Sequence, residues 1–188
     1  EGDIPIFDMP YDHARPQEKT YKGGEVAYGL GPDLTARIRK ICEECKVTEY
    51  MLFMSATMVL LSKYCNQEDI VVGTPISGRT HKDTEQMLGM FVNTLAMRGK
   101  PEKNKTFREF LMEIKDMCFK AYENQDYPIE ELIEELNIPR DISRNPLYDV
   151  LFVFQNNDEG TYAFDGLDFD WVERETDVSK TDLNFTIG

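Results

Sequence analysis

The sequence predicts an α/β domain, a β-sheet packed by helices. A continuous apolar run, Ile70–Ile76, is typical of a strand that is covered on both faces. Before and after that run, apolar residues recur at helical spacing. Near the C-terminal end, apolar and polar residues alternate over Leu183–Ile187, which indicates a half-buried strand. A chain of 188 residues is long enough for one such domain with a sizeable core.

The N-terminal part is predicted to run from an extended segment through a short strand into a helix. Residues 1–24 are rich in proline, glycine and charge, which indicates an extended lead-in. A short strand is expected over Glu25–Leu30. Gly31-Pro32-Asp33 then begins a helix that reaches about Lys46. Its apolar positions recur at helical spacing and are Leu34, Ile38, Ile41 and Cys45.

A second helix is predicted after Thr48, which caps it, with Glu49 in the positive first turn. The helix is apolar almost all round, so we expect it to be buried on most sides. The apolar run Tyr50–Cys65 is shorter than the roughly 20 residues that a membrane span requires. No membrane partner is therefore expected.

The middle of the chain is predicted to contain two strands and two helices. After the buried strand, a loop and a short helix lead to a second strand, Phe91–Arg98. Thr106-Phe107-Arg108-Glu109 is a capping box, and the helix that it begins has one apolar stripe. After Tyr127-Pro128, a short acidic helix is expected over Ile129–Leu136.

The last third of the sequence changes to β periodicity. Leu147–Phe154 is β-rich, and residues 156–160 form a predicted turn. Residues 161–164 and 167–171 alternate on either side of a second predicted turn at Asp165-Gly166. The strand over Leu183–Ile187 needs a partner or leaves an exposed edge, so we expect this chain to be a piece of something larger.

The charge distribution argues against a nucleic-acid partner. The formal net charge is −14, and residues 121–188 contain 17 of the 35 acidic side chains but 4 of the 21 basic ones. Such a segment repels a phosphate backbone. The first residues show no basic start followed by an apolar core, so no signal peptide is predicted and a cytoplasmic location is expected.

The sequence offers few groups for catalysis. Its two histidines, His13 and His81, fall in predicted loops, where a lone histidine is usually solvated. Ser77 lacks the G-x-S-x-G surroundings of a nucleophile elbow. Cys42 and Cys45 form a CxxC inside a predicted helix, so we expect buried thiols and no metal site. No complete active site is predicted.

Polar residues within apolar surroundings are more informative. Arg79 follows the buried strand at its end, where α/β sheets gather functional groups. Asn93-Thr94 interrupts the second strand, and residues 140–147 place two guanidinium groups, a carboxylate and an amide just before a core strand. Loop caps and strand-end ion pairs explain these residues equally well from the sequence alone.

Four strings, three of which contain these residues, resemble in order the later motifs of condensation domains from nonribosomal peptide synthetases. They are VVGTPISGRTH, MLGMFVNTLAMR, ENQDYPIEELIEEL and PRDISRNPLYDVLFVFQN. The lead-in is similar to the segment that opens the second lobe of that family, so the resemblance covers essentially all 188 residues. It implies a chloramphenicol-acetyltransferase-like lobe, a mixed sheet packed by helices in a two-layer α+β sandwich, truncated at its C-terminal end.

The resemblance also implies a reaction. Such domains pair two lobes around a tunnel, and two carrier proteins insert phosphopantetheine arms from opposite ends. The α-amine of the acceptor attacks the donor thioester and forms a peptide bond without a covalent acyl-enzyme. The motif HHxxxDG lies in the first lobe, and neither His13 nor His81 fits it. We therefore expect no catalytic residue in this chain and no activity of the chain by itself.

The family's positions carry over residue by residue. Arg79, in ISGR, resembles the arginine that salt-bridges the aspartate of HHxxxDG across the lobe junction. Asn93, in GMFVNTL, and Gln125 and Asp126, in NQDYP, match positions that support the tunnel or its walls. The matched positions that we expect to be structural are Gly73, Gly78, Arg140, Asp141, Arg144 and Asn145. The phenylalanine usual after YP is Ile129 here.

The implied domain organisation is a lead-in from the preceding lobe over residues 1–24 and a partial C-terminal lobe over residues 25–188. The implied partners are the N-terminal lobe of the same domain, upstream and downstream peptidyl carrier proteins, and an adjacent adenylation domain. Phosphopantetheine comes on the carriers, with no cofactor bound directly.

Condensation is preferred to the other functions that we considered for this sequence. A non-catalytic docking module of the same fold stays open. An acyltransferase that uses coenzyme A requires a basic phosphate site, which the acidic sequence does not indicate. Epimerisation domains have different strings in place of MFVNTL and NQDYP. Heterocyclisation domains replace the histidine motif, which this sequence does not contain.

Overall fold

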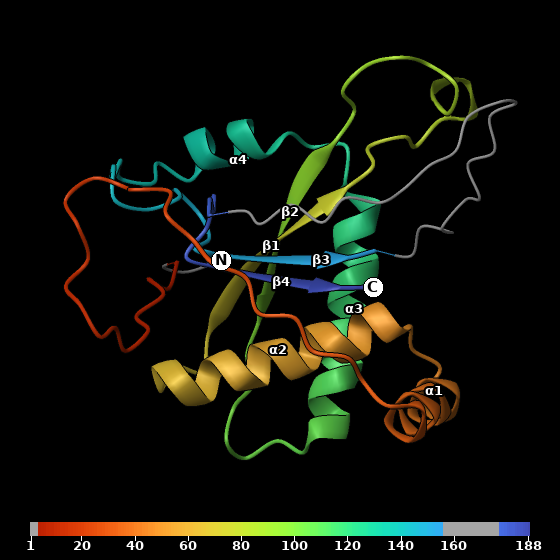
Figure 1. Cartoon of the computed structure of the whole chain (residues 1–188). Helices are drawn as coiled ribbons and strands as arrows, with labels where there is room; N and C mark the ends of the chain where they lie inside the picture. Colours follow the sequence, from red (N-terminus) through yellow and green to blue (C-terminus); the bar gives the residue numbers. More distant parts are fainter. Residues whose placement is uncertain (1–3, 156–176) are drawn as a thin grey trace, which may run out of the picture.

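The computed structural model describes residues 4–155 and 177–188. Its strands are β1 (Ile70–Ile76), β2 (Asn93–Gly99), β3 (Val150–Phe154) and β4 (Leu183–Ile187). They form a four-stranded sheet in the order β2-β1-β3-β4 (Figure 1). β1 pairs antiparallel with β2 and parallel with β3, and β3 pairs parallel with β4. The sheet is therefore mixed, as the resemblance implies.

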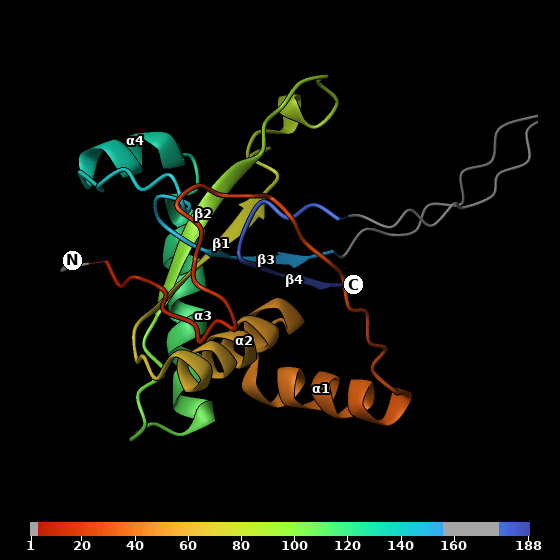
Figure 2. The ribbon, with the colours of Figure 1, turned by 60° about the vertical axis from the view of Figure 1, so that its left-hand side comes forward.

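Helices pack against this sheet. They are α1 (Pro32–Cys45), α2 (Glu49–Cys65), α3 (Phe107–Glu123) and α4 (Ile129–Glu135), with a 3-10 turn, η1 (Lys82–Thr84), after β1. α2 and α3 form a second layer on one face of the sheet, where they pack on each other and against β1 and β2, and α1 lies outside α2 (Figure 2). α4 contacts β2 at the opposite end of the molecule from α1 (Figure 1). None of the helices in the described ranges has the length and apolar character needed to cross a bilayer.

The core lies between the sheet and the α2–α3 layer. Residues 70–74 of β1 are all buried, which confirms the prediction of a strand covered on both faces. Alternate residues of the other strands also face this layer. The largest fully buried side chains include Met54 and Met58 from α2, Phe110 and Ile114 from α3, and Phe152 from β3.

The predicted starts of two helices are confirmed. The Thr48 hydroxyl accepts a hydrogen bond from the backbone N–H of Met51, at 3.2 Å. Thr106 and Glu109 form the full capping box: the Thr106 hydroxyl accepts from the Glu109 N–H at 3.2 Å, and the Glu109 carboxylate accepts from the Thr106 N–H at 2.8 Å. Such reciprocal bonds satisfy N–H groups that the first turn of a helix leaves without partners.

The strand predicted over Glu25–Leu30 is wrong. This segment has no regular secondary structure, and the side chains of Val26 and Tyr28 are 97% and 89% exposed. Apolar and polar residues alternate in this segment as they do in a strand, but a strand also requires a neighbouring strand that completes its backbone hydrogen bonds. Pairing is instead confined to an antiparallel bridge just before it, between Lys22 and Val178.

Other predicted boundaries shift by a few residues. β2 begins at Asn93 and not at Phe91, and β3 begins at Val150 and not at Leu147. In both places the residues before the strand are in loops. The turns and alternating segments predicted over residues 156–171 lie outside the described residues.

Candidate functional site

The side chain of Asn93 links the start of β2 to the turn between α3 and α4. Its Nδ2 group donates to the backbone oxygens of Gln125 and Tyr127, both at 2.9 Å. Its Oδ1 atom accepts from the N–H groups of Thr94, at 2.8 Å, and Ile129, at 3.4 Å. An amide side chain offers two donors and two acceptor lone pairs, so all of them are used inside the protein. We call these five residues the Asn93 cluster.

Gln125 and Asp126 extend this arrangement. The Gln125 side chain donates to the backbone oxygen of Tyr122 at 2.9 Å, which closes the end of α3. The exposed Asp126 carboxylate accepts from the Thr80 hydroxyl at 3.2 Å and so ties the loop after β1 to the α3–α4 turn. Three of the residues predicted to support the tunnel, Asn93, Gln125 and Asp126, are therefore brought together at this end of the sheet.

Arg79 lies in the loop after β1, and its contacts are with that loop. Its guanidinium donates to the backbone oxygens of Thr84 and Gly89 and lies over the Phe91 ring, 4.4 Å from the ring centroid. Gly78 precedes it with a φ of +62°, and a Cβ there would overlap the carbonyl oxygen of Phe91. The predicted structural role of Gly78 thus has a physical basis in this turn.

Apolar side chains project from the same loop into solvent. Leu88 is fully exposed, and the other large exposed side chains of this segment are Met87, Met90 and Val92. An exposed group of large apolar residues beside a guanidinium is typical of a surface that contacts another polypeptide.

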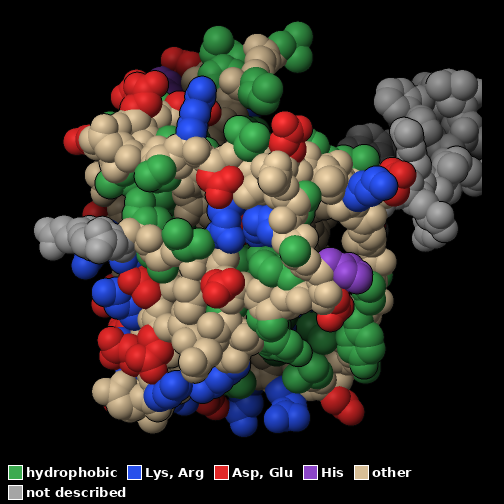
Figure 3. Space-filling view, turned by 90° about the vertical axis from the view of Figure 1, so that its left-hand side faces the viewer, with side chains coloured by type: hydrophobic (Ala, Val, Ile, Leu, Met, Phe, Trp, Pro, Cys, Tyr) green, Lys and Arg blue, Asp and Glu red, His purple; other side chains and the backbone are tan. Residues whose placement is uncertain are grey.

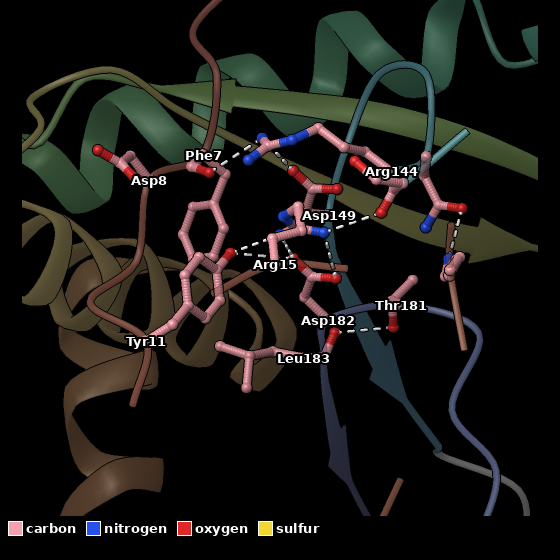
Figure 4. A network of polar contacts seen from close by, with 12 residues as sticks. Phe7, Asp8, Tyr11, Arg15, Arg144, Asp149, Thr181, Asp182 and Leu183 are labelled. Carbon is pink, nitrogen blue, oxygen red and sulfur yellow. Dashed lines mark hydrogen bonds and ion pairs between the residues drawn. The ribbon is translucent and has the colours of Figure 1, made fainter. Parts of the chain in front are cut away.

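A second polar cluster surrounds the predicted string at residues 140–147 (Figure 4). The Arg144 guanidinium donates to the backbone oxygen of Phe7 at 3.1 Å and to the Asp149 carboxylate at 3.0 Å. The Asn145 side chain accepts from the Lys19 ammonium at 2.9 Å. The Asp141 carboxylate accepts from the N–H and hydroxyl of Ser143, at 2.8 and 2.7 Å. Arg140, in contrast, is exposed.

The lead-in supplies the other half of this cluster. Arg15 forms an ion pair with Asp182, just before β4, and donates to the backbone oxygen of Ser143 at 2.9 Å. The Tyr11 hydroxyl donates to the same Asp182 carboxylate at 3.1 Å. We call Arg15, Lys19, Arg144, Asn145, Asp149 and Asp182 the lead-in cluster. On the face that carries the lead-in, side chains of both charges are interspersed with hydrophobic ones (Figure 3).

Burial and hydrogen bonds shift the pKa values in this second cluster. Burial raises the pKa of Asp149, and the nearby charge of Asp182 adds to the rise, whereas Arg144 opposes it. Hydrogen bonds from the Ser143 side chain and backbone lower the pKa of Asp141. A cavity of about 470 Å³ lies beside the cluster, between the lead-in, the start of β1 and the segment after α4.

The sequence did not predict Arg15, Lys19, Asp149 or Asp182 as members of a cluster. Arg15 and Asp182 are 167 residues apart, and no local pattern marks either of them. The sequence singled out the string at residues 140–147, but it could not show that the lead-in contacts this string.

Neither histidine lies in a polar cluster that favours proton transfer. The side chains of His13 and His81 are exposed, and the His81 ring accepts a hydrogen bond from the Asp83 N–H at 3.3 Å within η1. A general base must lie within hydrogen-bond reach of the proton that it removes.

A family model for the condensation domain matches residues 1–188. The chain belongs to the condensation domain family. Among curated relatives, Bacitracin synthase 1 of Bacillus licheniformis is 46% identical over 186 residues, 99% of this chain and 4% of that protein. Gramicidin S synthase 2 of Brevibacillus brevis is 49% identical over 183 residues, 96% of this chain and 4% of that protein.

Solved structures of condensation-type domains share the fold. A chain from the complex of the X-domain and OxyB from teicoplanin biosynthesis matches with a TM-score of 0.87 and 26% identity, over 98% of this chain and 40% of that chain. The condensation domain of the Monacolin K polyketide synthase matches with a TM-score of 0.72 and 25% identity, over 81% of this chain and 37% of that chain. These likenesses confirm the predicted chloramphenicol-acetyltransferase-like fold class.

Proposed function

We propose that this condensation-domain chain forms most of the second lobe of a domain in a nonribosomal peptide synthetase. In this proposal residues 1–24 lead in from the preceding lobe and residues 25–188 form a partial C-terminal lobe. The observation that supports it is a family match over all of a sequence that contains no HHxxxDG. The chain also spans 4% of the length of two relatives that are named as synthases of peptide antibiotics.

The reaction that we propose for the parent domain is amide formation. The α-amine of a carrier-bound acceptor attacks the thioester carbonyl of a carrier-bound donor. The C–N bond forms, the C–S bond breaks, and the donor's phosphopantetheine leaves as a thiol after a proton moves from the amine to the sulfur. Two carrier proteins bring the phosphopantetheine arms of donor and acceptor. An adenylation domain is adjacent in the same synthetase. The histidine that assists this step belongs to another segment of the polypeptide.

In this proposal the chain forms part of the wall of the tunnel between the two lobes. Because Asn93 uses all of its hydrogen bonds within the protein, it holds the α3–α4 turn in place and does not need to contact substrate. Arg79 and the apolar side chains of its loop form the surface that meets the first lobe. Gln125 and Asp126 hold the turn and the loop together.

The proposal is tested with donor and acceptor carriers that are loaded with aminoacyl thioesters. The 188-residue chain is compared with the same chain extended upstream by a lobe that contains HHxxxDG. We expect dipeptidyl carrier, detected by mass spectrometry, from the extended protein alone. A matched control replaces the second histidine of that motif by alanine, which removes the product. Turnover by the 188-residue chain on its own contradicts the proposal.

The same experiment separates catalysis from docking. If the extended protein binds both carriers but forms no dipeptide, the chain belongs to a non-catalytic docking module. Carrier binding is measured by calorimetry in parallel with the product assay. We expect binding and product together.

A further inference from the structure

The side chain of Gln67 binds the backbone of the lead-in. Its Nε2 group donates to the backbone oxygen of Ile6 at 2.7 Å, and its Oε1 atom accepts from the backbone N–H of Asp8 at 3.3 Å. One amide group thus satisfies an acceptor and a donor that lie two residues apart, as the backbone of a neighbouring strand does. The contact is made with the main chain and with no side chain of the lead-in.

The backbone of Gln67 is itself fixed by the end of α2. α2 ends at Cys65, and Asn66 follows in the left-handed conformation with a φ of +50°. The Gln67 N–H then donates to the backbone oxygen of Ser62 at 3.2 Å, a bond typical of helix C-terminal ends. β1 begins three residues later, at Ile70. The amide is therefore presented from a short connection between two core elements.

Arg144 holds the residue between the two that Gln67 binds. Its guanidinium donates to the backbone oxygen of Phe7 at 3.1 Å (Figure 4). The Phe7 ring is buried in the core, whereas Ile6 is 68% exposed. Within the described ranges, residues 4–15 form no backbone–backbone hydrogen bond. One buried ring and three hydrogen bonds from side chains therefore hold residues 6–8.

Close packing does not replace these hydrogen bonds. Residues 4–7 line the cavity of about 470 Å³, whose other walls include Ile70 and Val71 of β1 and Leu136 after α4. A segment that borders a cavity makes fewer dispersion contacts than one that is packed on all sides. The bonds from Gln67 and Arg144 therefore contribute a large share of what keeps this part of the lead-in in place.

We propose that Gln67 is a positioning residue that recognises the backbone of residues 6–8 and holds the lead-in at the start of β1. Because the recognised atoms belong to the main chain, the side chain at position 6 does not decide the contact. Gln67 thereby sets where the preceding lobe joins this one, a consequence that rests on the function proposed above.

The decisive variant is Gln67→Glu. It keeps the shape of the side chain but replaces the donor by a carboxylate oxygen that faces the Ile6 oxygen. The readout is cleavage on the amino side of Asp8 by an aspartate-specific endoproteinase, measured as the release of residues 1–7 by mass spectrometry. Cleavage requires the segment to open locally. Loss of one hydrogen bond predicts cleavage roughly fivefold faster than in the wild type.

Controls separate this local hold from charge and from unfolding. Gln17→Glu, at an exposed glutamine of the lead-in, makes the same charge change, and Ile6→Ala keeps the recognised backbone atoms. Both are expected to be cleaved at the wild-type rate. Cleavage before the buried Asp149 reports unfolding of the whole domain and should not change in any variant.

A second variant, Gln67→Met, removes both polar atoms of the side chain without adding charge, and we expect it to accelerate cleavage before Asp8 as well. The inference is overturned if Gln67→Glu and Gln67→Met are both cleaved at the wild-type rate. It is also overturned if Gln17→Glu or Ile6→Ala accelerates cleavage as much, or if cleavage before Asp149 rises equally.

The consequence for catalysis is measured in the extended protein with its first lobe. We expect Gln67→Glu to lower kcat several-fold and to leave the KM for both carriers unchanged, because in this proposal Gln67 contacts the lead-in and not a carrier. Unchanged kcat in an active protein overturns the positioning role. An inactive wild-type protein speaks instead against the proposed function, and the cleavage experiment still decides whether Gln67 holds the lead-in.

Discussion

The side chain of Asn93 uses all of its hydrogen-bonding groups within the protein, which indicates that it holds backbone segments together and does not take part in chemistry. A side chain that contacts substrate needs a free donor or acceptor, whereas both Nδ2 hydrogens and the Oδ1 atom of Asn93 are bonded to the backbone. Three of these bonds are 2.8–2.9 Å long, within the usual range for strong N–H···O bonds. The residue therefore fixes backbone segments relative to one another.

Asn93→Asp is expected to destabilise the fold. The substitution keeps the size of the side chain, removes two donors and places a carboxylate beside the backbone oxygens of Gln125 and Tyr127. Leaving such groups unpaired predicts a loss of about 1–3 kcal/mol in the free energy of unfolding, measured by urea denaturation. The exposed Asn104 supplies the control, Asn104→Asp. An equal midpoint for the two variants contradicts the holding role.

Asp69 is expected to make the stability pH-dependent. The Arg98 side chain donates to it at 2.7 and 2.8 Å, and these hydrogen bonds lower the pKa of Asp69 below its usual value. Because the folded pKa is below the unfolded one, the pair stabilises the fold above the unfolded pKa of about 3.9. That contribution is lost as the pH falls through the lower, folded pKa.

Thermal melts measure this effect. We expect the difference in Tm between the wild type and Asp69→Asn to be largest near neutral pH and to shrink below about pH 4. Asp12→Asn, at an exposed aspartate, is the control and should follow the wild-type curve. A constant difference across this range means that the Asp69 charge does not contribute.

At the residue scale, the sequence singled out the strings but not the contacts. Asn93, Gln125 and Asp126 were predicted to support one site, and the structure brings them together. Arg15 and Tyr148 were not singled out, because they contact Asp182 and Gly73, which are distant from them in sequence. A local pattern shows which residue types occur, but not which chain segment faces them.

At the scale of elements, a helix or strand was predicted correctly where the residues that determine it lie close together in the sequence. Helix starts were predicted correctly because a cap and the N–H groups that it satisfies lie within a few residues. The segment Glu25–Leu30 was predicted wrongly because a strand depends on a distant partner. β1 was predicted correctly because burial on both faces leaves a continuous apolar run.

Thr106→Ala is expected to weaken the start of α3. The substitution removes the hydroxyl that accepts from the Glu109 N–H, and N-cap losses of this kind cost about 0.5–2 kcal/mol. The measurement is the free energy of unfolding together with hydrogen exchange in the first turn of α3. Thr20→Ala, at an exposed threonine of the lead-in, is the control. Equal stability of the two variants means that core packing alone sets where α3 begins.

At the scale of the whole molecule, the order of the strands could not be predicted from the residues alone. β3 is adjacent to β1, although β2, α3 and α4 lie between them in sequence. Parallel pairing of this kind requires long connections, and nothing in the local pattern of either strand specifies its neighbour. The mixed sheet was expected from the family resemblance, which supplied the long-range information.

The lead-in is held to the body of the domain by charge as well as by packing. Asp182 accepts from both Tyr11 and Arg15, and Lys19 is held by Asn145. These bonds join the first residues of the chain to the segment before β4, at the place where the proposed function puts the connection between two lobes. Arg15 and Asp182 are both half-buried, so the pair is screened less than a surface ion pair.

Asp182→Asn is therefore expected to release the lead-in without unfolding the domain. The amide keeps the shape of the carboxylate but removes the charge that holds Arg15, so the lead-in should open more often. Limited trypsin digestion at Lys22, an exposed residue of the lead-in, measures that opening, and we expect cleavage several-fold faster than in the wild type. Glu44→Gln, which breaks the exposed pair of Lys40 and Glu44, is the matched control and should leave the rate unchanged. If both variants are cleaved at the wild-type rate, packing around Phe7 and not the Arg15–Asp182 pair holds the lead-in in place.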